Sequence, residues 1–353
     1  MYYLDKNIEK LNRVFDQNKR AGYLRLDLNE NPGGLAPAFI KEVLSEVDSE
    51  FVSEYPETLE FTQVLADYLN TDIGHICLVN GSAEGIRNII EAFTSPKGRI
   101  VGVTPSYAMF EVYSNMYGRD FFPVQYTESL EMPIENIINA LTDDTQLLIL
   151  LNPNNPVGNV YSDDEMSVLL NEAEKREITV LIDEAYFYFY DKTFIDYALT
   201  RDHIFVTRTF SKLFSLAGCR LGYVVGWPEG IKMVQKLCTP HNVNAFGMLF
   251  AKRILQTTGM IEEMVKNQLE GKKYLVVSLT QKGYKVNSGE GNFVFISTKT
   301  DPDRIVRRLK EEKGILVKVY SGIGSFGKCL RVSTGEKQYM QQFIDALLEL
   351  DQP

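Results

Sequence analysis

The chain has 353 residues, of which 44% are hydrophobic and 24% charged, a composition typical of a soluble globular protein with room for about two domains. Its formal net charge of −10 argues against sequence-independent binding to nucleic acid, which requires a basic surface. No stretch of about 18 apolar residues is present, and residues 1–20 are polar and lack the apolar core of a signal peptide. We therefore expect a cytoplasmic protein that neither spans a membrane nor binds nucleic acid.

The cysteines and histidines are scattered along the chain. No Cys-x-x-Cys pair is present, which favours free thiols in a reducing compartment. No two histidines have the i, i+4 spacing that places two ligands on one helix face, so we expect no metal site. These residues are Cys77, Cys219, Cys238 and Cys329, and His75, His203 and His241.

From about residue 75 to 230, short apolar runs alternate with helical stretches. Runs that are apolar on both sides predict strands covered on both faces, and hence a mainly parallel sheet. Alternation of strands and helices predicts an α/β fold that binds ligands at the carboxyl ends of its strands. The predicted strands are Ile76–Val79, Ile100–Val103, Leu147–Leu151, Thr179–Ile182, Ile204–Thr207 and Leu221–Val225, and the predicted helices include Ile86–Phe93 and Asp163–Arg176.

After about residue 240 the pattern changes to long amphipathic helices followed by strands and a last helix. We interpret this part as a smaller α+β domain, reached through a long helix near residues 230–256. The expected division is an N-terminal segment over 1–35 that joins the small domain, a large domain over 36–240 and a small domain over 241–353. The predicted elements are helices Ala245–Gln256, Met260–Gln281 and Lys337–Leu350, and strands Phe293–Ser297, Ile315–Val319 and Cys329–Ser333.

Lys212 is the first candidate for covalent chemistry. In Thr209-Phe210-Ser211-Lys212 it follows a predicted strand and stands beside hydroxyl residues. Desolvation and nearby cations lower the pKa of a lysine, which suits it to Schiff-base chemistry. Arg220, eight residues later, has a planar fork that matches a phosphate. Taken alone, the pattern also fits a solvated loop lysine and a surface arginine.

Asp183 is the second candidate, because it ends the apolar run of a predicted buried strand. An isolated buried carboxylate is costly and needs a partner. A protonated pyridine nitrogen is such a partner, and an acidic residue at that nitrogen tunes pyridoxal-5′-phosphate (PLP). A helix N-cap or a metal ligand would also fit an aspartate in this place.

Two turns add candidate binding groups. Asn80-Gly81-Ser82-Ala83-Glu84-Gly85 opens a helix, where free backbone N–H groups suit a phosphate, although capping by Ser82 alone would explain the same residues. The segment Asn152-Pro153-Asn154-Asn155-Pro156-Val157-Gly158 contains two Asn-Pro steps, which make a rigid turn and hold side-chain amides in fixed directions.

In their order and spacing these motifs resemble the fold-type I, PLP-dependent aminotransferases of class I/II, and within them the branch of the histidinol-phosphate aminotransferases. The resemblance runs from about Leu26 to the C-terminus. It implies an α/β fold with a mainly parallel sheet in the large domain and a smaller α+β C-terminal domain. The motifs that carry it are Leu28-Asn29-Glu30-Asn31-Pro32, Tyr55-Pro56, Ser82-Ala83-Glu84-Gly85, Pro105-Ser106-Tyr107, the 152–158 turn, Asp183-Glu184-Ala185-Tyr186, Thr209-Phe210-Ser211-Lys212, Gly218-Cys219-Arg220 and Leu330-Arg331-Val332-Ser333.

The resemblance implies a role for each matching residue around PLP. Lys212 would hold the cofactor as a Schiff base and then act as general acid and base, while Asp183 would keep the ring nitrogen protonated. Asn155 and Tyr186 would hydrogen-bond the phenolic oxygen, and Tyr107 would stack on the ring. The phosphate would be bound by the backbone of Ala83 and Glu84, together with Ser82, Thr209, Ser211 and Arg220.

The resemblance also implies how substrate and subunits meet. Arg331 would pair in a bidentate manner with the substrate α-carboxylate, a geometry that suits Arg and not Lys. Asn29 lies in the N-terminal segment, which in this family closes over the active site. Tyr55 would reach the cofactor phosphate of a neighbouring subunit, which implies a homodimer with shared active sites.

The chain departs from the family pattern on the substrate side. Where the branch usually has an arginine thirteen residues before Arg331, this chain has Lys318, and where an aromatic residue usually follows the proline near position 240, it has His241. The N-terminal Pro-Tyr-x-Pro-Gly pattern is replaced by Arg13-Val14-Phe15-Asp16-Gln17, and Gly33-Gly34 replaces an aromatic residue and a glycine. Unchanged cofactor residues beside changed substrate residues indicate the same chemistry on a different substrate.

We therefore expect an aminotransferase that moves an amino group from an amino-acid donor, with glutamate as first candidate, to a small anionic keto or aldehyde acceptor such as a phosphorylated one. Lys318, Lys328 and His241 supply cationic groups for that substrate, and we expect histidinol phosphate itself to be used poorly. The alternative is a PLP-dependent decarboxylase of a small phosphorylated amino acid, similar to threonine-phosphate decarboxylases, which needs the same Lys212, Asp183 and Arg331. A regulator of the same fold would need an added DNA-binding domain, and a nucleotide-binding protein would need a Gly-x-Gly-x-x-Gly turn.

Overall fold

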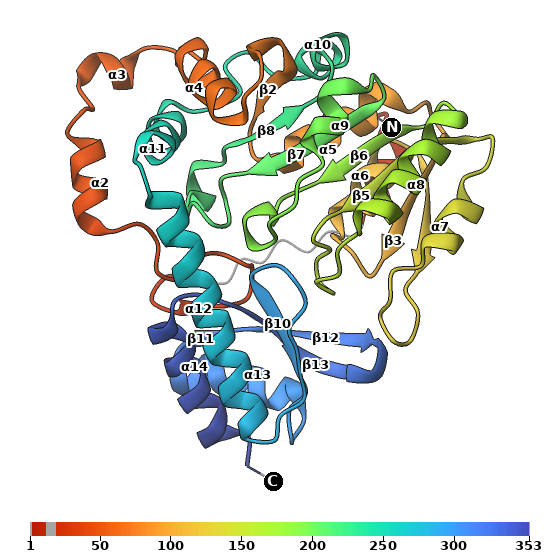
Figure 1. Ribbon diagram of the computed structural model, residues 1–353. Coiled ribbons are helices and arrows are strands. Elements are labelled where there is room, and N and C mark those ends of the chain that lie inside the picture. The colour runs from red at the N-terminus through yellow and green to blue at the C-terminus, as the bar shows by residue number, and fades with distance from the viewer. Residues whose placement is uncertain (1, 12–18, 353) are drawn as a thin grey trace.

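The large domain is built on a seven-stranded sheet, seen in a computed structural model that describes residues 2–11 and 19–352 (Figure 1). The strand order is β2-β8-β7-β6-β5-β3-β4, and every strand except β8 runs in the same direction. The prediction of a mainly parallel sheet is therefore confirmed. The strands are β2 (Ile76–Val79), β3 (Arg99–Thr104), β4 (Asp120–Gln125), β5 (Thr145–Leu151), β6 (Thr179–Asp183), β7 (Ile204–Thr209) and β8 (Gly222–Val225).

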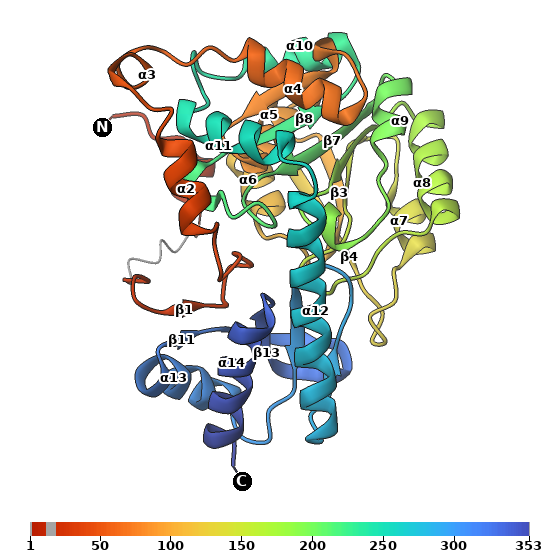
Figure 2. The ribbon, with the colours of Figure 1, turned by 60° about the vertical axis from the view of Figure 1, so that its left-hand side comes forward.

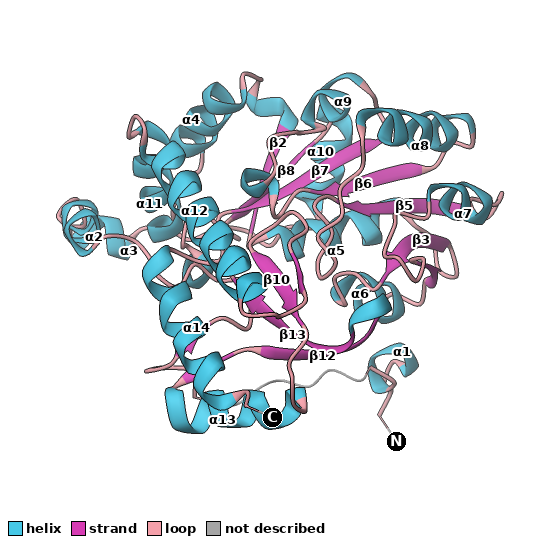
Figure 3. Ribbon diagram, turned by 60° about the horizontal axis from the view of Figure 1, so that its bottom comes forward, coloured by secondary structure: helices cyan, strands magenta, loops and turns pink. Residues whose placement is uncertain are grey.

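Helices cover both faces of this sheet, which explains why its strands are apolar on both sides (Figure 3). Along β5, Leu148 and Leu150 face one core cluster, while Leu147 and Ile149 face the other. The first face is covered by α2 (Pro37–Leu44), α4 (Leu59–Leu69), α7 (Ile134–Ala140), α8 (Asp163–Lys175), α9 (Ile195–Thr200) and α11 (Ala245–Gln256), and the second by α5 (Ser82–Phe93), α6 (Met109–Met116) and α10 (Pro228–Lys236). The short helices α1 (Lys6–Glu9) and α3 (Ser49–Ser53) lie outside these cores.

A four-stranded antiparallel sheet of order β12-β13-β10-β9 forms the small domain, and helices pack against it around a core of its own. The N-terminal strand β1 pairs in parallel with β11 of the small domain, so the N-terminal segment packs there (Figure 2). The elements are β1 (Leu24–Arg25), β9 (Val286–Asn287), β10 (Phe293–Ile296), α13 (Pro302–Lys313), β11 (Ile315–Leu316), β12 (Lys318–Ile323), β13 (Gly327–Ser333) and α14 (Lys337–Leu350).

The helix that joins the two domains is α12 (Met260–Gln281), which runs from the large domain into the small one in Figures 1 and 2. The expectation of a connecting helix near residues 230–256 is wrong. That stretch forms two helices, α10 and α11, and α11 buries Met248, Ala251 and Ile254 in the large-domain core. We therefore place the boundary between the domains inside α12 and not at residue 240.

Two strand assignments also differ from the sequence prediction. The edge strand β4 was not predicted, because it is mostly exposed and contains Pro123, a residue that sheets tolerate at their edges. The predicted strand Ile315–Val319 is two strands with different partners, since β11 pairs with β1 whereas β12 pairs with β13. The apolar pattern continues through Val317 and hides this division.

The fold brings three strand ends to one edge of the large sheet. Adjacent parallel strands β5, β6 and β7 end at Leu151, Asp183 and Thr209. Ligands bind at such carboxyl edges in open α/β sheets. None of the helices among the described residues combines the length and apolar character needed to cross a membrane.

Candidate active site

A cavity of about 290 Å³ lies at this carboxyl edge, between the large-domain strands and the N-terminal segment. Most of the residues expected to bind the cofactor line it. Those residues are Ser82, Ala83, Tyr107, Asn155, Asp183, Tyr186, Thr209, Ser211, Lys212 and Arg220, and they are joined by Leu28, Glu30, Leu151, Ala185 and Ala217.

Asp183 is the buried carboxylate of the cavity, with 2% of its surface exposed. It ends β6, where the Thr207 hydroxyl of the neighbouring strand donates to its Oδ1 at 3.0 Å and the Ala185 backbone N–H donates at 3.2 Å. Burial raises the pKa of Asp183 to about 7, although the two donors act in the opposite direction. The carboxylate therefore lacks a full charge partner within its own surroundings.

Lys212 also lines the cavity, three residues after β7 ends. Its Nζ donates to the Leu28 backbone carbonyl at 3.0 Å and lies 5.8 Å from the centre of the Tyr186 ring. Burial, with the cations Arg331 and Arg220, lowers the pKa of Lys212 to about 8, against the opposing charges of Glu30 and Asp183. A substantial fraction of this amine is neutral at pH 7 to 8, which makes it a nucleophile and a proton acceptor.

A third part of the cavity is formed by the start of α5 together with Thr209, Ser211 and Arg220, and we call this group of residues the cup. Gly81 precedes α5 with a φ of 74°, and a Cβ at this position would overlap the Arg220 guanidinium. Arg220 Nη1 also lies 3.4 Å from the Ser211 hydroxyl oxygen, and Thr209 donates its hydroxyl to Ser211 at 2.9 Å. The first turn of a helix, two hydroxyls and a guanidinium make a strong site for a dianion.

Asn29 and Arg331 do not line the cavity, but each donates a hydrogen bond to a residue that does. Asn29 is buried with a φ of 57°, and its Nδ2 donates to the Tyr186 hydroxyl at 2.9 Å. Arg331 is 3% exposed, and its Nη1 donates to Asn155 Oδ1 at 3.0 Å and to the Tyr320 hydroxyl at 3.3 Å. Its Nη2 donates to the Asp27 backbone carbonyl. These acceptors are all neutral, and within the described chain its Nε is buried without a hydrogen-bond partner.

Besides Asn29 and Arg331, four more of the expected site residues do not line this cavity. The carboxylate of Glu84 accepts from the Asn80 backbone N–H at 2.6 Å and from Asn242 Nδ2 at 2.9 Å, so this side chain braces the turn. Tyr55 and His241 are exposed and stack on each other with ring centres 4.2 Å apart. Lys318 lies opposite Arg331 in the β12–β13 register but lines a separate hollow.

Some residues of the site were missed from the sequence. Glu30 lines the cavity and belongs to a motif that carried the resemblance, but Arg20 binds its carboxylate, with Nη2 2.5 Å from Oε2. Thr207, which holds Asp183, lies within a predicted strand and had no polar pattern to mark it. Tyr320 contacts Arg331 only because β12 and β13 pair, which local sequence does not show.

The described residues fit PLP group by group. The buried Asp183 lacks the cation that a protonated ring nitrogen would provide, and the partly neutral Lys212 suits the cofactor aldehyde. The cup at Gly81 and Arg220 suits the phosphate. No cluster of three or more potential metal ligands occurs among the described residues.

The buried carboxylate predicts a stability that depends on pH in the cofactor-free protein. Folding raises the pKa of Asp183 from 3.8 to about 7. Ionisation of this carboxyl therefore does not lower the free energy of unfolding below pH 4, lowers it increasingly between pH 4 and 7, and lowers it by a constant amount at higher pH. This decrease reaches roughly 4 kcal/mol at pH 8. Asp183→Asn should therefore stabilise the cofactor-free protein at pH 8, and chemical denaturation at pH 4.5, 6 and 8 measures this. If the free energy of unfolding differs between wild type and Asp183→Asn by the same amount at all three pH values, the account is wrong.

Comparisons with known proteins identify relatives of the whole chain. Residues 21–347 match the family described as Aminotransferase class I and II. The histidinol-phosphate aminotransferase of Thermoanaerobacter pseudethanolicus is 32% identical over 331 residues, 92% of each chain. Among solved structures, the histidinol-phosphate aminotransferase of Clostridium acetobutylicum has a TM-score of 0.82 and 25% identity over 93% of this chain and 99% of that one.

The histidinol-phosphate aminotransferase of Sinorhizobium meliloti, solved in complex with PLP, has a TM-score of 0.88, covers 99% of this chain and 98% of that one, and at 21% identity is similar in fold. The family match covers nearly the whole described chain, and the curated relative extends over the same length. The chain therefore belongs to the PLP-dependent class I and II aminotransferases, in the branch of the histidinol-phosphate aminotransferases.

Proposed function

We propose that this aminotransferase moves an amino group from an α-amino acid, with glutamate as first candidate, to a small anionic keto or aldehyde acceptor. One observation carries the proposal. A single cavity places a buried carboxylate, Asp183, and a lysine of lowered pKa, Lys212, beside an anion-binding cup at Arg220. This combination serves chemistry at an amino-acid Cα better than it serves simple binding.

When bound, PLP supplies a conjugated ring that accepts the electron pair released at the substrate Cα. In our proposal the Asp183 carboxylate, buried and already accepting from Thr207 and Ala185, holds a positive charge on the ring nitrogen. Lys212 attaches the cofactor and then moves the proton at Cα, for which its pKa of about 8 is well matched to neutral pH. Asn155 and Tyr186 bind the ring oxygen, Tyr107 covers the ring face, and the cup binds the phosphate.

We assign the substrate carboxylate to Arg331. Its guanidinium is almost fully buried, and its partners Asn155, Tyr320 and the Asp27 carbonyl are neutral oxygen acceptors. A buried cation without a carboxylate is costly, and a substrate α-carboxylate would supply the missing charge. Asn155 then links the two halves of the site, since it lines the cofactor cavity and accepts from Arg331.

The acceptor is the part of the proposal that separates this chain from its relatives. Lys318 is the cross-strand neighbour of Arg331 and stands where the branch usually has an arginine, so a planar fork is replaced by a point charge. Its separate hollow of about 190 Å³ is also lined by Lys19, Arg20 and Lys310 and by the carboxylate of Asp27, which pairs with Arg20, so the hollow carries a net positive charge. The departure at Phe15 lies outside the described residues. We propose an anionic, in particular phosphorylated, acceptor smaller than histidinol phosphate.

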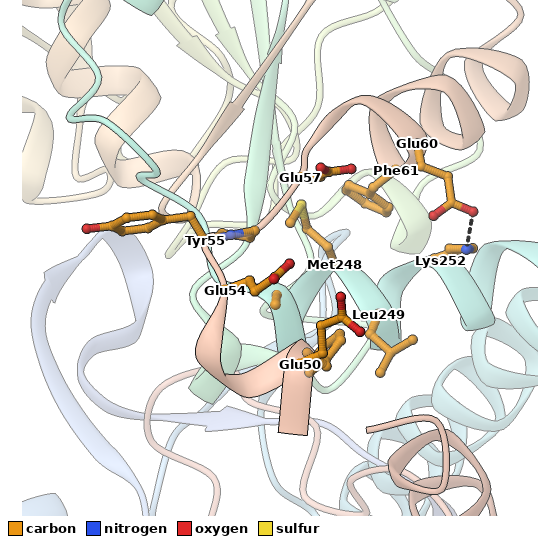
Figure 4. A pocket seen from close by; sticks show the side chains of 12 residues that line it. Glu50, Glu54, Tyr55, Glu57, Glu60, Phe61, Met248, Leu249 and Lys252 are labelled. Carbon is orange, nitrogen blue, oxygen red and sulfur yellow. Dashed lines mark hydrogen bonds and ion pairs between the residues drawn. The ribbon is translucent and has the colours of Figure 1, made fainter. Parts of the chain in front are cut away.

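We further propose a homodimer with shared sites. Tyr55 is 76% exposed, and Figure 4 shows it at the rim of a hollow, with its hydroxyl directed away from Met248 and Leu249. The hollow is lined by apolar side chains and also by Glu50, Glu54, Glu57, Glu60 and Lys252. Exposed Val52 and Leu59 lie on the adjoining segments. An exposed aromatic residue among exposed apolar side chains is typical of an interface. In the proposed dimer, Tyr55 reaches the cofactor phosphate of the partner, and His241 supports its ring.

Borohydride reduction of the PLP-loaded protein should attach the cofactor to Lys212 alone. Lys212 faces the cavity, whereas Lys272, which is also buried with a lowered pKa, donates to the carbonyls of Gly289 and Gly291 and serves as the matched control. Peptide mapping of the wild type, Lys212→Ala and Lys272→Arg measures this. Label on a different lysine in the wild type would overturn the assignment.

Histidinol phosphate should have a kcat/KM about 10 to 100 times below that of the best small phosphorylated amine, because a charged hydrogen bond is worth about 1.5–3 kcal/mol. Lys318→Arg should recover part of this loss, whereas Lys328→Arg should not, since Lys328 is held by Asp301 and Asp303. If the kcat/KM for histidinol phosphate is the highest by tenfold or more, the departures from the family pattern on the substrate side do not change substrate choice, and the proposal is wrong. If carbon dioxide is released together with the amine product, the protein is a decarboxylase and the aminotransferase proposal is wrong.

Shared sites predict complementation between two impaired variants. Lys212→Ala and Tyr55→Ala should each have low activity alone. In a mixed dimer, the site with Lys212 from one chain and Tyr55 from the other is intact, so co-refolded protein should regain a substantial part of the wild-type rate. Sedimentation gives the oligomeric state. A fully active monomer, or no recovery in a mixed dimer that sedimentation confirms, would contradict the proposal.

A further inference from the structure

Two cysteines that are 161 positions apart in the sequence lie against each other in the fold. Cys77 Sγ and Cys238 Sγ are 3.8 Å apart. Cys77 is buried in the edge strand β2, and Cys238 is partly exposed just after α10 ends. The Gln235 side chain of α10 also donates to the Ile76 carbonyl at 3.4 Å, so the contact between α10 and β2 does not depend on the sulfurs alone.

The surroundings make one of these thiols the more reactive. Asn88 Nδ2 lies 3.4 Å from Cys238 Sγ, and Asn88 itself is fully buried in α5. The hydrogen bond with Cys77 and that of Asn88 lower the pKa of Cys238, against the effect of burial. The same pairing and burial raise the pKa of Cys77. Because Cys238 is partly exposed whereas Cys77 is buried, we take Cys238 as the attacking thiol and Cys77 as the resolving one.

We propose that Cys77 and Cys238 are a modification site that closes into a reversible intramolecular disulfide on reaction with a disulfide of low molecular weight, such as oxidised glutathione. To form the bond, the two sulfurs need to approach from 3.8 Å to about 2.05 Å. The site is specific to this pair, since Cys219 and Cys329 lie elsewhere in the fold.

The reaction consists of two thiol–disulfide exchanges. The Cys238 thiolate attacks one sulfur of the small disulfide, forms a mixed disulfide and displaces one small thiolate. The Cys77 sulfur, deprotonated as it reacts, attacks the Cys238 sulfur and displaces the second small thiolate. The protein loses two electrons and two protons, and the small disulfide takes them up as two thiols. Excess dithiol reverses both steps.

The pair also lies next to the cup. Cys77 is three residues before Asn80, and Cys238 is four residues before Asn242. Asn242 Nδ2 donates to the Leu78 carbonyl at 3.0 Å and to Glu84 Oε2 at 2.9 Å, and the same Oε2 accepts from the Asn80 backbone N–H at 2.6 Å. A disulfide would tie together the two segments that these bonds join, so the cup would open less often. This consequence rests on the proposed function of the cup, whereas the disulfide itself does not.

The first test maps the bond in the PLP-loaded protein. The protein is treated with oxidised glutathione, its remaining thiols are alkylated, and its peptides are analysed by mass spectrometry. We expect a Cys77–Cys238 linked peptide about 2 Da lighter than the two separate thiol peptides, with Cys219 and Cys329 alkylated. In Cys77→Ser, glutathione should instead remain on Cys238. Free or glutathionylated Cys238 in the treated wild type, without the linked peptide, would overturn the proposal.

The second test follows cofactor release from the oxidised and reduced forms into an apoenzyme trap, with Cys219→Ser as the matched control. We expect the oxidised wild type and oxidised Cys219→Ser to release PLP several times more slowly than their reduced forms, and Cys77→Ser to show no such difference. An equal rate in the mapped disulfide form would overturn the coupling to the cup while the modification site stands. Failure of the protein to bind PLP would instead overturn the proposed function of the cup.

Discussion

Asp183 and the neighbouring Glu184 are consecutive buried carboxylates with opposite surroundings. Glu184 is bound by Arg208, whose Nε and Nη2 donate to the same Oε2 at 2.9 and 2.8 Å, so that its charge is neutralised inside the fold. Asp183 has hydrogen-bond donors but no such cation, and burial raises its pKa to about 7. The fold neutralises Glu184 but leaves Asp183, which lines the cavity, without a cation bound to it. A positively charged ligand group in that cavity would neutralise Asp183.

The rest of the site is arranged around this unmatched charge. Parallel strands β6 and β7 place Thr207 beside Asp183, and the chain beyond β7 brings Lys212 to the same cavity. The antiparallel strand β8 brings Gly222 against the Ser82 backbone nitrogen, where a Cβ would lie only 2.6 Å away, so the cup packs directly on the sheet. Leu28 and Glu30 of the N-terminal segment complete the cavity lining.

Sequence alone predicted most of the large domain, because strands apolar on both faces and motifs at strand ends are local features. Most of the residues that line the cavity had been named from the family resemblance, but Glu30 was missed. The sequence prediction failed where pairing between distant segments decides the outcome. The strand over 315–319 is divided by two different partners, Tyr320 reaches Arg331 across a sheet, and Cys77 meets Cys238 through the packing of α10 on β2. No spacing within the chain encodes these contacts.

Arg331 and Lys318, which we assign to the substrate, belong to the small domain, whereas Asp183 and the cup belong to the large domain. Arg331 is held by neutral acceptors from three parts of the chain, Asp27, Asn155 and Tyr320, and Lys318 is its neighbour across the strand pair. A substitution at Lys318 would therefore change the charge near Arg331 without touching Asp183 or the cup. In our proposal, this separation lets the same chemistry act on a different acceptor.

The protonation state of the cofactor ring nitrogen tests the central claim most directly. PLP labelled with ¹⁵N in the ring is bound to the wild type and to Asp183→Asn, and its ¹⁵N chemical shift is followed by NMR from pH 6 to 9. The buried carboxylate should keep the nitrogen protonated over this whole range in the wild type, while Asp183→Asn should lose that proton within it. A nitrogen that is already deprotonated in the wild type at pH 8 would contradict the account.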